Sequence, residues 1–161
     1  MLHRKLPKLR YSLGAVFFIV GLFAVLFLGL RHWRDNRPVE WEAYSDAIFT
    51  QHVNDDRPVL ILVGADWDMN SLVVQGWIFK DLNLVRTLNR KSVILYYADL
   101  TDIANTPVKN LLRRHGRNST PTVLIYPNGV SGNCVVFGGG IPNPEEIAQS
   151  LMATPIKPTG G

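Results

Sequence analysis

The chain has 161 residues and a formal net charge of +4, which allows one globular domain and one accessory segment. Residues 1–37 hold seven of the 17 lysines and arginines and a single acid, whereas residues 38–161 hold ten basic and twelve acidic side chains. The larger part of the chain is therefore slightly acidic and offers no obvious basic face that could track a phosphate backbone, which argues against a nucleic-acid partner.

The first predicted element is an apolar helix at residues 11–30, with no charged residue from Ser12 to Leu30. A helix of this length spans roughly 28 Å, close to the hydrocarbon thickness of a bilayer. A cleaved signal peptide usually has a shorter apolar core that ends in a small-x-small site, and the segment before Arg31 has no such site. The sequence therefore predicts an uncleaved signal anchor that crosses the lipid bilayer once through residues 11–30.

Basic residues flank this span, four before it and three after it: Arg4, Lys5, Lys8 and Arg10, then Arg31, Arg34 and Arg37. By this small margin, the positive-inside rule favours a cytoplasmic N-terminus at residues 1–10. Trp33 and Trp41 suit an interfacial position after the span. We expect a protein of the cytoplasmic (inner) membrane, with a juxtamembrane linker at residues 31–40 and its C-terminal domain on the periplasmic side.

The C-terminal domain is predicted at residues 41–152 and begins with an amphipathic helix within residues 38–56. Five aliphatic residues at 59–63 are typical of a strand buried on both faces. The elements expected after it are helices from Asp68 to about Phe79 and at 84–91, a strand at 92–98, a helix at 106–116, strands at 122–126 and 133–137 that form a hairpin, and a helix at 143–152.

This order joins a βαβ unit to a ββα unit, so the predicted class is α/β, with a central mixed sheet flanked by helices. Residues 153–161 are expected to be a flexible tail. The only cysteine is Cys134, so a disulfide within the chain and a multi-cysteine metal site are both impossible.

The order of elements is that of the thioredoxin fold, and three motifs resemble that family. The stretch VLILVGADWD, at 59–68, looks like the strand and turn that carry W-C-x-x-C; STPT, at 119–122, is similar to the segment with the cis proline; and FGGG, at 137–140, resembles the closing strand and glycine turn. Over residues 40–152 the chain resembles the C-terminal periplasmic thioredoxin-like domain of bacterial thiol:disulfide interchange proteins.

The resemblance fails at the residues that carry the family's chemistry. The two reactive cysteines correspond to Asp68 and Ser71, in the motif Asp68-Met69-Asn70-Ser71. A carboxylate and a hydroxyl cannot form a disulfide, because that chemistry needs a thiolate and a resolving thiol. The buried acid that the family places six residues before the first cysteine corresponds to Leu62. We therefore expect a domain without dithiol redox activity.

Asp68 suits a helix N-cap, which accounts for an aspartate at that position. Ser71 as a nucleophile would need a nearby base, and no motif links it to His52 or His115. An acidic cluster is the alternative site: Asp66, Asp68, Asp99 and Asp102 follow the carboxyl ends of two strands that should be neighbours. Such carboxylates could hold a hard cation, although ordinary loop acids account for the same pattern.

Two further features leave alternatives open. Cys134 falls in the predicted second hairpin strand, where it is either a small core residue or a reactive thiol acting with a partner thiol. The resemblance also implies that Pro121 faces the motif turn and offers backbone groups to an extended peptide. The leading interpretation is a membrane-anchored module that binds a protein or peptide at a groove formed by Trp67, Asp68, Thr120 and Pro121, with no cofactor.

Overall fold

The structure, a computed structural model, describes residues 13–51, 57–130 and 132–152, in two compact units divided after Arg34. Several predicted features lie outside the described residues, namely the basic segment 1–10, the helix end at 52–56 with His52, and the tail at 153–161.

The N-terminal unit is built on α1, which runs from Leu13 to Asn36. Its apolar side chains are exposed from Val16 to Leu30. The stretch Val16–Asn36 is long and apolar enough to cross a membrane, with a mean hydropathy of 2.0, a property that signal sequences share. The helix continues through 31–36, where the sequence predicted a linker, because this stretch contains no proline or glycine to end it and Pro38 lies just beyond.

The second unit contains a five-stranded sheet of order β1-β3-β2-β4-β5. Its strands are β1 (Glu42–Ala43), β2 (Val59–Gly64), β3 (Ile94–Asp99), β4 (Thr122–Tyr126) and β5 (Val135–Gly138). Strands β1, β3 and β2 are parallel to one another, whereas β4 is antiparallel to both β2 and β5. A mixed sheet is what the sequence predicted, although β1 was not among the predicted strands.

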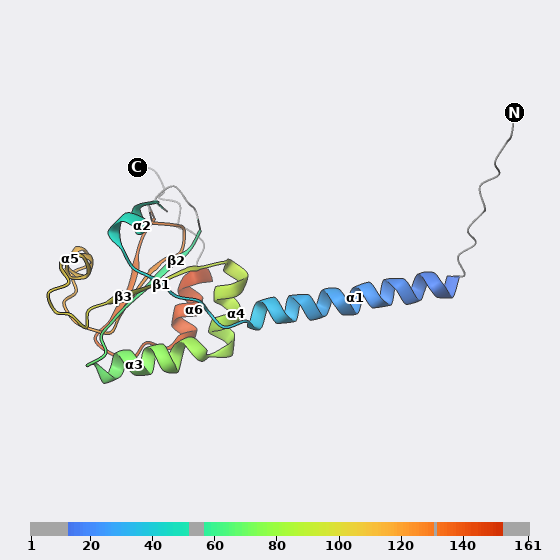
Figure 1. Ribbon diagram of the computed structural model, residues 1–161, viewed down its shortest axis with the longest axis horizontal. Helices are drawn as coiled ribbons and strands as arrows, with labels where there is room; N and C mark the ends of the chain where they lie inside the picture. Colours follow the sequence, from blue (N-terminus) through green and yellow to red (C-terminus); the bar gives the residue numbers. More distant parts are fainter. Residues whose placement is uncertain (1–12, 52–56, 131, 153–161) are drawn as a thin grey trace, which may run out of the picture. The chain divides into compact units, whose positions relative to one another are not determined.

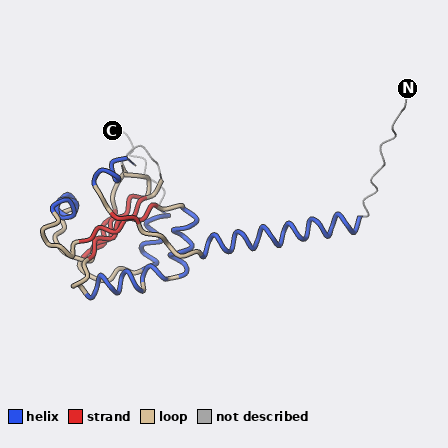
Figure 2. Tube along the Cα trace, viewed as in Figure 1, coloured by secondary structure: helices blue, strands red, loops and turns tan. Residues whose placement is uncertain are grey.

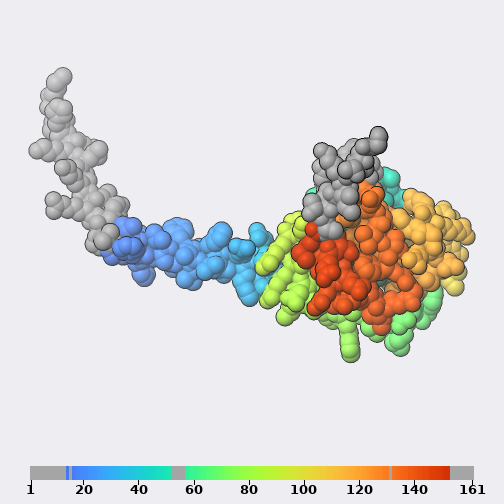
Figure 3. All heavy atoms as spheres, turned by 180° about the vertical axis from the view of Figure 1, so that it is seen from behind, coloured from blue at the N-terminus to red at the C-terminus, as the bar shows by residue number. Residues whose placement is uncertain are grey.

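Helices cover both faces of this sheet (Figures 1 and 2). On one face, α2 (Asp46–Gln51) and α5 (Thr106–Arg114) cover a core that includes Phe49, Tyr96 and Leu111. On the other face lie α3 (Met69–Gly76), the 3-10 helix η1 (Ile78–Lys80), α4 (Leu82–Lys91) and α6 (Pro144–Met152). Helices α4 and α6 lie side by side there, as Figure 3 also shows. All six residues of β2 are buried, so this strand is the centre of the domain.

One predicted element was wrong. The sequence predicted a helix starting near Trp41, but residues 42–43 form the edge strand β1, and α2 begins only at Asp46. Trp41 packs into the core on one face of the sheet and Tyr44 into the core on the other, which is the alternation of a strand. Pairing with Tyr96 and Tyr97 of β3 decides this segment, and that long-range contact is invisible to helical spacing.

Smaller boundary shifts have local causes. Strand β3 starts at Ile94 instead of residue 92, because Ser92 adopts a left-handed conformation (φ 51°) that closes α4. Helix α3 ends at Gly76, short of Phe79, and α4 begins at Leu82. Asp81 is the N-cap of α4, and its carboxylate accepts hydrogen bonds from the backbone N–H groups of Asn83 and Leu84.

Candidate functional site

The candidate site begins where β2 passes through the turn 65–68 into α3. Leu62 is fully buried in β2, as an apolar residue in a central strand should be. Asp68 is the N-cap of α3, with extended backbone angles of φ −99° and ψ 108°, and its Oδ1 accepts a hydrogen bond of 3.1 Å from the backbone N–H of Asn70. The predicted cap is therefore confirmed.

The carboxylate of Asp68 also contacts a side chain of α3 and lies near one that is distant in the sequence. Ser71 Oγ donates a hydrogen bond of 2.7 Å to Asp68 Oδ2, and the side chain of Thr120 lies near the same carboxylate. Burial opposes ionisation here, but the hydrogen bond from Ser71, the nearby Thr120 side chain and the backbone bonds together hold the pKa of Asp68 below its usual value. The two positions that correspond to the family's cysteines are thus linked by a charge-assisted hydrogen bond.

The loop before β4 completes this arrangement. The Thr120–Pro121 peptide bond is cis, as the resemblance implied, and Pro121 is buried. Thr122 pairs with Val63 at the end of β2, which places the loop beside the motif turn. The loop that carries Thr120 and Pro121 therefore lies near Asp68 and Ser71.

Trp67 stands at the exposed edge of this cluster. Its side chain is 59 % exposed, while its indole Nε1 donates a hydrogen bond of 3.3 Å to the carbonyl of Thr101, which fixes the ring against the loop after β3. Met69 and Ile103 are also highly exposed, at 71 % and 63 %. These three large apolar side chains near one turn form an exposed hydrophobic surface, which is typical of a binding site.

A groove of about 250 Å³ lies next to Trp67. Its apolar lining includes Leu100, Ile103 and Leu112, and its basic side chains are Lys109, Arg113 and Arg117. Sequence reasoning missed these residues as part of the site, because they come from the β3–α5 loop, α5 and the segment after it. Only the packing of α5 on the sheet brings them beside the motif turn.

Tyr97 is a second residue that the sequence did not indicate. A Cβ atom built on Gly64 would meet the Tyr97 hydroxyl at 3.0 Å and the Ser71 Cβ at 3.3 Å, so the strand, the tyrosine and the motif helix are tightly packed below the turn. Burial, followed by the charges of Asp99 and Asp66, raises the pKa of Tyr97. The tyrosine is therefore neutral at physiological pH.

Three of the acidic residues considered as alternative cation ligands have other roles. Asp99 and Asp102 each accept a 2.8 Å hydrogen bond from a backbone N–H group two residues ahead, which is turn chemistry, and Asp68 caps α3. Among the described residues, no group of three or more His, Cys, Asp or Glu side chains is arranged to hold a metal ion. Asp66, in the turn after β2, is not part of such a group either; its backbone N–H donates a hydrogen bond to Thr101 Oγ1.

Cys134 lies just before β5 at the far end of the hairpin from Pro121. Its Sγ donates a hydrogen bond of 3.6 Å to the carbonyl of Val135, which pairs with Ile125 near the end of β4, whereas Thr122 at the other end of β4 adjoins Pro121. These two ends are roughly 13 Å apart, at about 3.3 Å per residue. Burial raises the pKa of the half-buried Cys134 thiol, which lowers its reactivity. The structure therefore does not bring this thiol into the motif.

A serine nucleophile is not supported by the described residues. Ser71 is only 3 % exposed, and its hydroxyl donates to Asp68. The Nε2 atom of His115 lies 2.7 Å from the Tyr126 hydroxyl, at the end of β4 that is remote from Ser71. No candidate base for Ser71 is therefore found between residues 57 and 130, apart from the carboxylate that already binds it.

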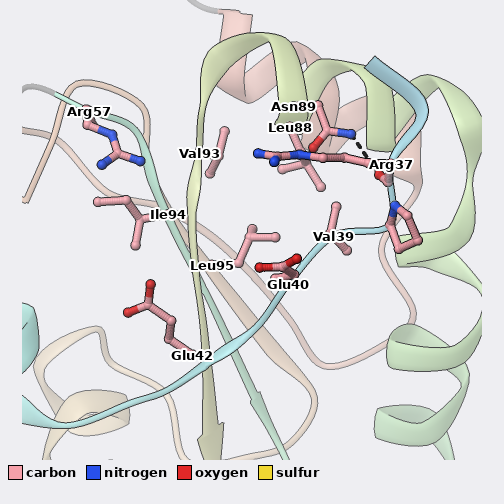
Figure 4. A pocket seen from close by; sticks show the side chains of 11 residues that line it. Arg37, Val39, Glu40, Glu42, Arg57, Leu88, Asn89, Val93, Ile94 and Leu95 are labelled. Carbon is pink, nitrogen blue, oxygen red and sulfur yellow. Dashed lines mark hydrogen bonds between the residues drawn. The ribbon is translucent and has the colours of Figure 1, made fainter. Parts of the chain in front are cut away.

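A second cavity, of about 210 Å³, lies at the β1 edge of the sheet (Figure 4). Arg37, Glu40, Glu42 and Arg57 supply its charged side chains, and none of the residues predicted for the site lines it. The segment 37–42 passes along β3 here and covers part of an edge that would otherwise invite pairing with another chain. We assign this cavity a structural role.

Solved thioredoxin structures are similar to this chain. A thioredoxin from Thermus thermophilus has a TM-score of 0.52 and 17 % identity, covering 72 % of this chain and 86 % of its own. Trxlp from Edwardsiella tarda EIB202 has a TM-score of 0.52 and 24 % identity, covering 70 % and 98 %, and a thioredoxin from Trypanosoma brucei brucei has 0.52 and 17 %, covering 72 % and 91 %. No family model and no curated protein sequence matches the chain.

The chain therefore has a thioredoxin-like fold, as its motifs predicted. At these identities the likeness concerns the fold alone.

Proposed function

We propose that this protein is a membrane-anchored, thioredoxin-like binding module without dithiol chemistry, which holds an extended segment of a protein or peptide in the groove beside Trp67. The observation that carries this proposal is the hydrogen bond from Ser71 to Asp68 beside Thr120. Where the resemblance places two cysteines, the chain has a hydrogen-bonded carboxylate and hydroxyl that cannot exchange disulfides.

The proposed binding role rests on the exposed side chains and the backbone segment that surround Asp68 and Ser71. Trp67, Met69 and Ile103 stay exposed, and the segment 119–121 lies beside them with its cis proline. An extended peptide can pair its backbone with such a segment and place alternate side chains in a groove. The basic side chains of Lys109, Arg113 and Arg117 favour a bound segment with an apolar residue flanked by acids.

Peptide binding is tested with the full chain in nanodiscs and a panel of peptides with one apolar residue flanked by acidic, neutral or basic residues. We expect the acid-flanked peptides to bind tightest, and Trp67→Ala and Ile103→Asp each to weaken binding at least tenfold. Gln149→Ala, an exposed change on α6, is the matched control and should bind normally. If Trp67→Ala and Ile103→Asp both bind the peptides as tightly as the native chain, the groove beside Trp67 is not the binding site.

Redox inactivity is tested by insulin reduction with the same full chain. We expect no turnover above the background of dithiothreitol alone. Turnover that disappears in Cys134→Ser would favour the alternative function, a thiol–disulfide oxidoreductase that acts through Cys134.

Membrane anchoring is the part of the proposal that α1 supports by its length and composition. We expect the intact chain to stay in the membrane pellet after alkaline extraction, with the mass of the uncleaved protein. A soluble, shortened chain would identify the N-terminal segment as a cleaved signal sequence instead. Residues 40–152 resemble the periplasmic domains of thiol:disulfide interchange proteins, so we propose that the domain lies on the periplasmic side.

A further inference from the structure

A second exposed apolar surface lies away from the Trp67 groove, beside the segment through which the chain enters the domain. We call it the entry face and define it by Trp77, Leu82 and the groove between residues 36–41 and η1. Trp77 is 78 % exposed and Leu82 is 61 % exposed. Large side chains with this exposure are costly in water, so the surface is suited to an apolar or amphipathic partner.

The groove of the entry face has a volume of about 450 Å³ and a mainly apolar lining that includes Val39, Trp41, Phe79 and Leu82. The Trp41 and Phe79 rings meet edge to face, with centroids 4.8 Å apart, and form part of its wall. Trp41, which the sequence placed at a membrane interface, is therefore half-buried in the domain, and the more exposed indole is that of Trp77.

Three side chains of α4 hold the entering chain at this face. Arg90 Nε donates a hydrogen bond of 2.9 Å to Asp35 Oδ2, and Asn89 Nδ2 donates to the carbonyl of Asp35 at 3.1 Å. Asn89 Nδ2 also donates to the carbonyl of Arg37 at 2.9 Å (Figure 4). Arg86 Nε donates to Asn36 Oδ1 at 2.9 Å. Asp35 is only 3 % exposed. Residues 35–37 are therefore fixed on α4 and cannot act as a swinging linker.

This attachment limits how far the entry face can lie from a bilayer. Leu30, the last residue of the apolar run, precedes Asp35 by five residues, which reach at most about 18 Å when fully extended. Asn36 and Pro38 line the same groove as Leu82. With residues 11–30 in a bilayer, the groove is held within reach of the interfacial layer by covalent connection alone.

The charges around the entry face match an anionic lipid surface. Lys80 lies in η1, and Arg86, Arg90 and Lys91 lie in α4. Of the acids of this region, Asp35 and Asp81 are engaged with Arg90 and with the N-terminus of α4, and Glu40 lines the cavity at the β1 edge together with Arg37. Basic residues near a membrane are attracted to anionic headgroups, and tryptophan is enriched at headgroup depth. An exposed tryptophan and leucine beside lysines is the composition of an interfacial contact.

We propose that the entry face rests on the surface of an anionic lipid bilayer, with Trp77 and Leu82 at headgroup depth and Lys80 and Lys91 near the phosphates. The proposal depends on the membrane anchoring argued above but not on peptide binding. It makes the domain a body seated on the membrane, with the Trp67 groove as a separate surface.

The test uses the full chain with Cys134→Ser, reconstituted at one copy per nanodisc with phosphatidylcholine and phosphatidylglycerol. A nitroxide label is placed at Leu82→Cys, with Leu26→Cys in the span and Asn110→Cys on α5 as reference sites. The measured quantity is the ratio of accessibility to oxygen, which dissolves in lipid, over accessibility to a water-soluble nickel chelate. We expect the ratio at 82 to be several-fold higher than at 110 and lower than at 26.

Each other result overturns the proposal in a recognisable way. A high ratio at 26 with equal ratios at 82 and 110 leaves the anchor intact and refutes the entry-face contact. A low ratio at 26 refutes the anchoring and the contact together. Protection of 82 that requires two copies per disc assigns the face to a second copy of the chain.

A label at Trp77→Cys repeats the measurement without altering Leu82. Lys80→Gln with Lys91→Gln should lower the ratio at 82 in anionic nanodiscs, and should leave it unchanged in discs of phosphatidylcholine alone. An equal effect in both lipids would contradict the electrostatic part of the proposal.

Discussion

At the scale of single residues, Asp68 carries the most information about this domain. Its carboxylate accepts hydrogen bonds from Asn70 in its own turn and from Ser71 in the first turn of α3, and Thr120 in the loop before β4 lies near it. One side chain thus caps a helix and joins the two positions where the resemblance places cysteines. A carboxylate does both because it accepts several hydrogen bonds at once, whereas a thiol is a weak acceptor.

Replacing Asp68 with alanine should lower the free energy of unfolding by about 1–2 kcal/mol, because the cap of α3 is lost. Asp68→Asn should cost less, since asparagine is an equally good cap that lacks only the charge. Urea unfolding of both variants and the native chain measures the difference. Equal costs for the two variants would mean that the charge contributes more than the cap.

His115 is a second residue with a measurable effect. Burial, and then the charge of Arg114, lower the pKa of His115 below its ordinary value of 6.5. The unfolded chain therefore binds the proton more readily, so the contribution of His115 is complete above pH 6.5 and is lost as the pH falls through the lowered folded-state value.

We expect the urea midpoint of the native chain to fall as the pH is lowered from neutral through this range. In His115→Gln the fall should be shallower, because the group that takes up the proton is gone. Parallel pH profiles of the two proteins would refute this assignment.

At the scale of elements, the unit formed by β2, the turn and α3 keeps the frame that presents a dithiol in the family it resembles. Predicted from the sequence, the buried strand, the cap at Asp68 and the helix after it were all confirmed. The frame could be predicted because its signals are local, namely an aliphatic run, a capping residue and an amphipathic stretch.

The frame makes a direct prediction for Asp68→Cys with Ser71→Cys in a Cys134→Ser background. The two cysteines should form an intramolecular disulfide on mild oxidation, while circular dichroism stays that of the native fold. Thiol titration of the denatured protein before and after reduction counts the bridge, and Asp68→Cys alone is the control that cannot form it. A folded double variant that keeps two free thiols would show that the start of α3 is misplaced.

Helix α4 illustrates an element whose role no local signal revealed. Arg90→Ala removes a charge-assisted bond to the buried Asp35 carboxylate and should cost roughly 1.5–3 kcal/mol, more than an exposed ion pair contributes. Lys91→Ala, at the exposed neighbouring position, is the matched control and should change stability by less than about 0.5 kcal/mol. Urea midpoints that fall equally in both variants would contradict the role of Arg90 in holding Asp35 on α4.

At the scale of the whole molecule, the proposed orientation of the domain rests on the balance of basic residues around the proposed membrane span. The bias toward a cytoplasmic N-terminus comes from four basic residues against three. An orientation set by so small a difference should be easy to disturb.

We expect a reporter enzyme that works only outside the cytoplasm to be active when fused to the C-terminus of the native chain. Arg4→Gln with Lys5→Gln should lower that activity by creating mixed orientations. Arg113→Gln with Arg114→Gln removes the same charge far from the span in the sequence and should have no effect. Unchanged activity in the first variant would mean that other features determine the orientation.

The sequence by itself determined the order of elements from β2 onward, the helix cap, the absence of a redox pair and the single apolar span, because each depends on neighbouring residues or on composition. Tertiary structure alone decided that residues 42–43 form an edge strand, that Ile103 and Arg113 border the groove beside Trp67, and that α4 holds residues 35–37. These features join segments that are far apart in the chain. Their physical cause is packing across the sheet, which local spacing does not encode.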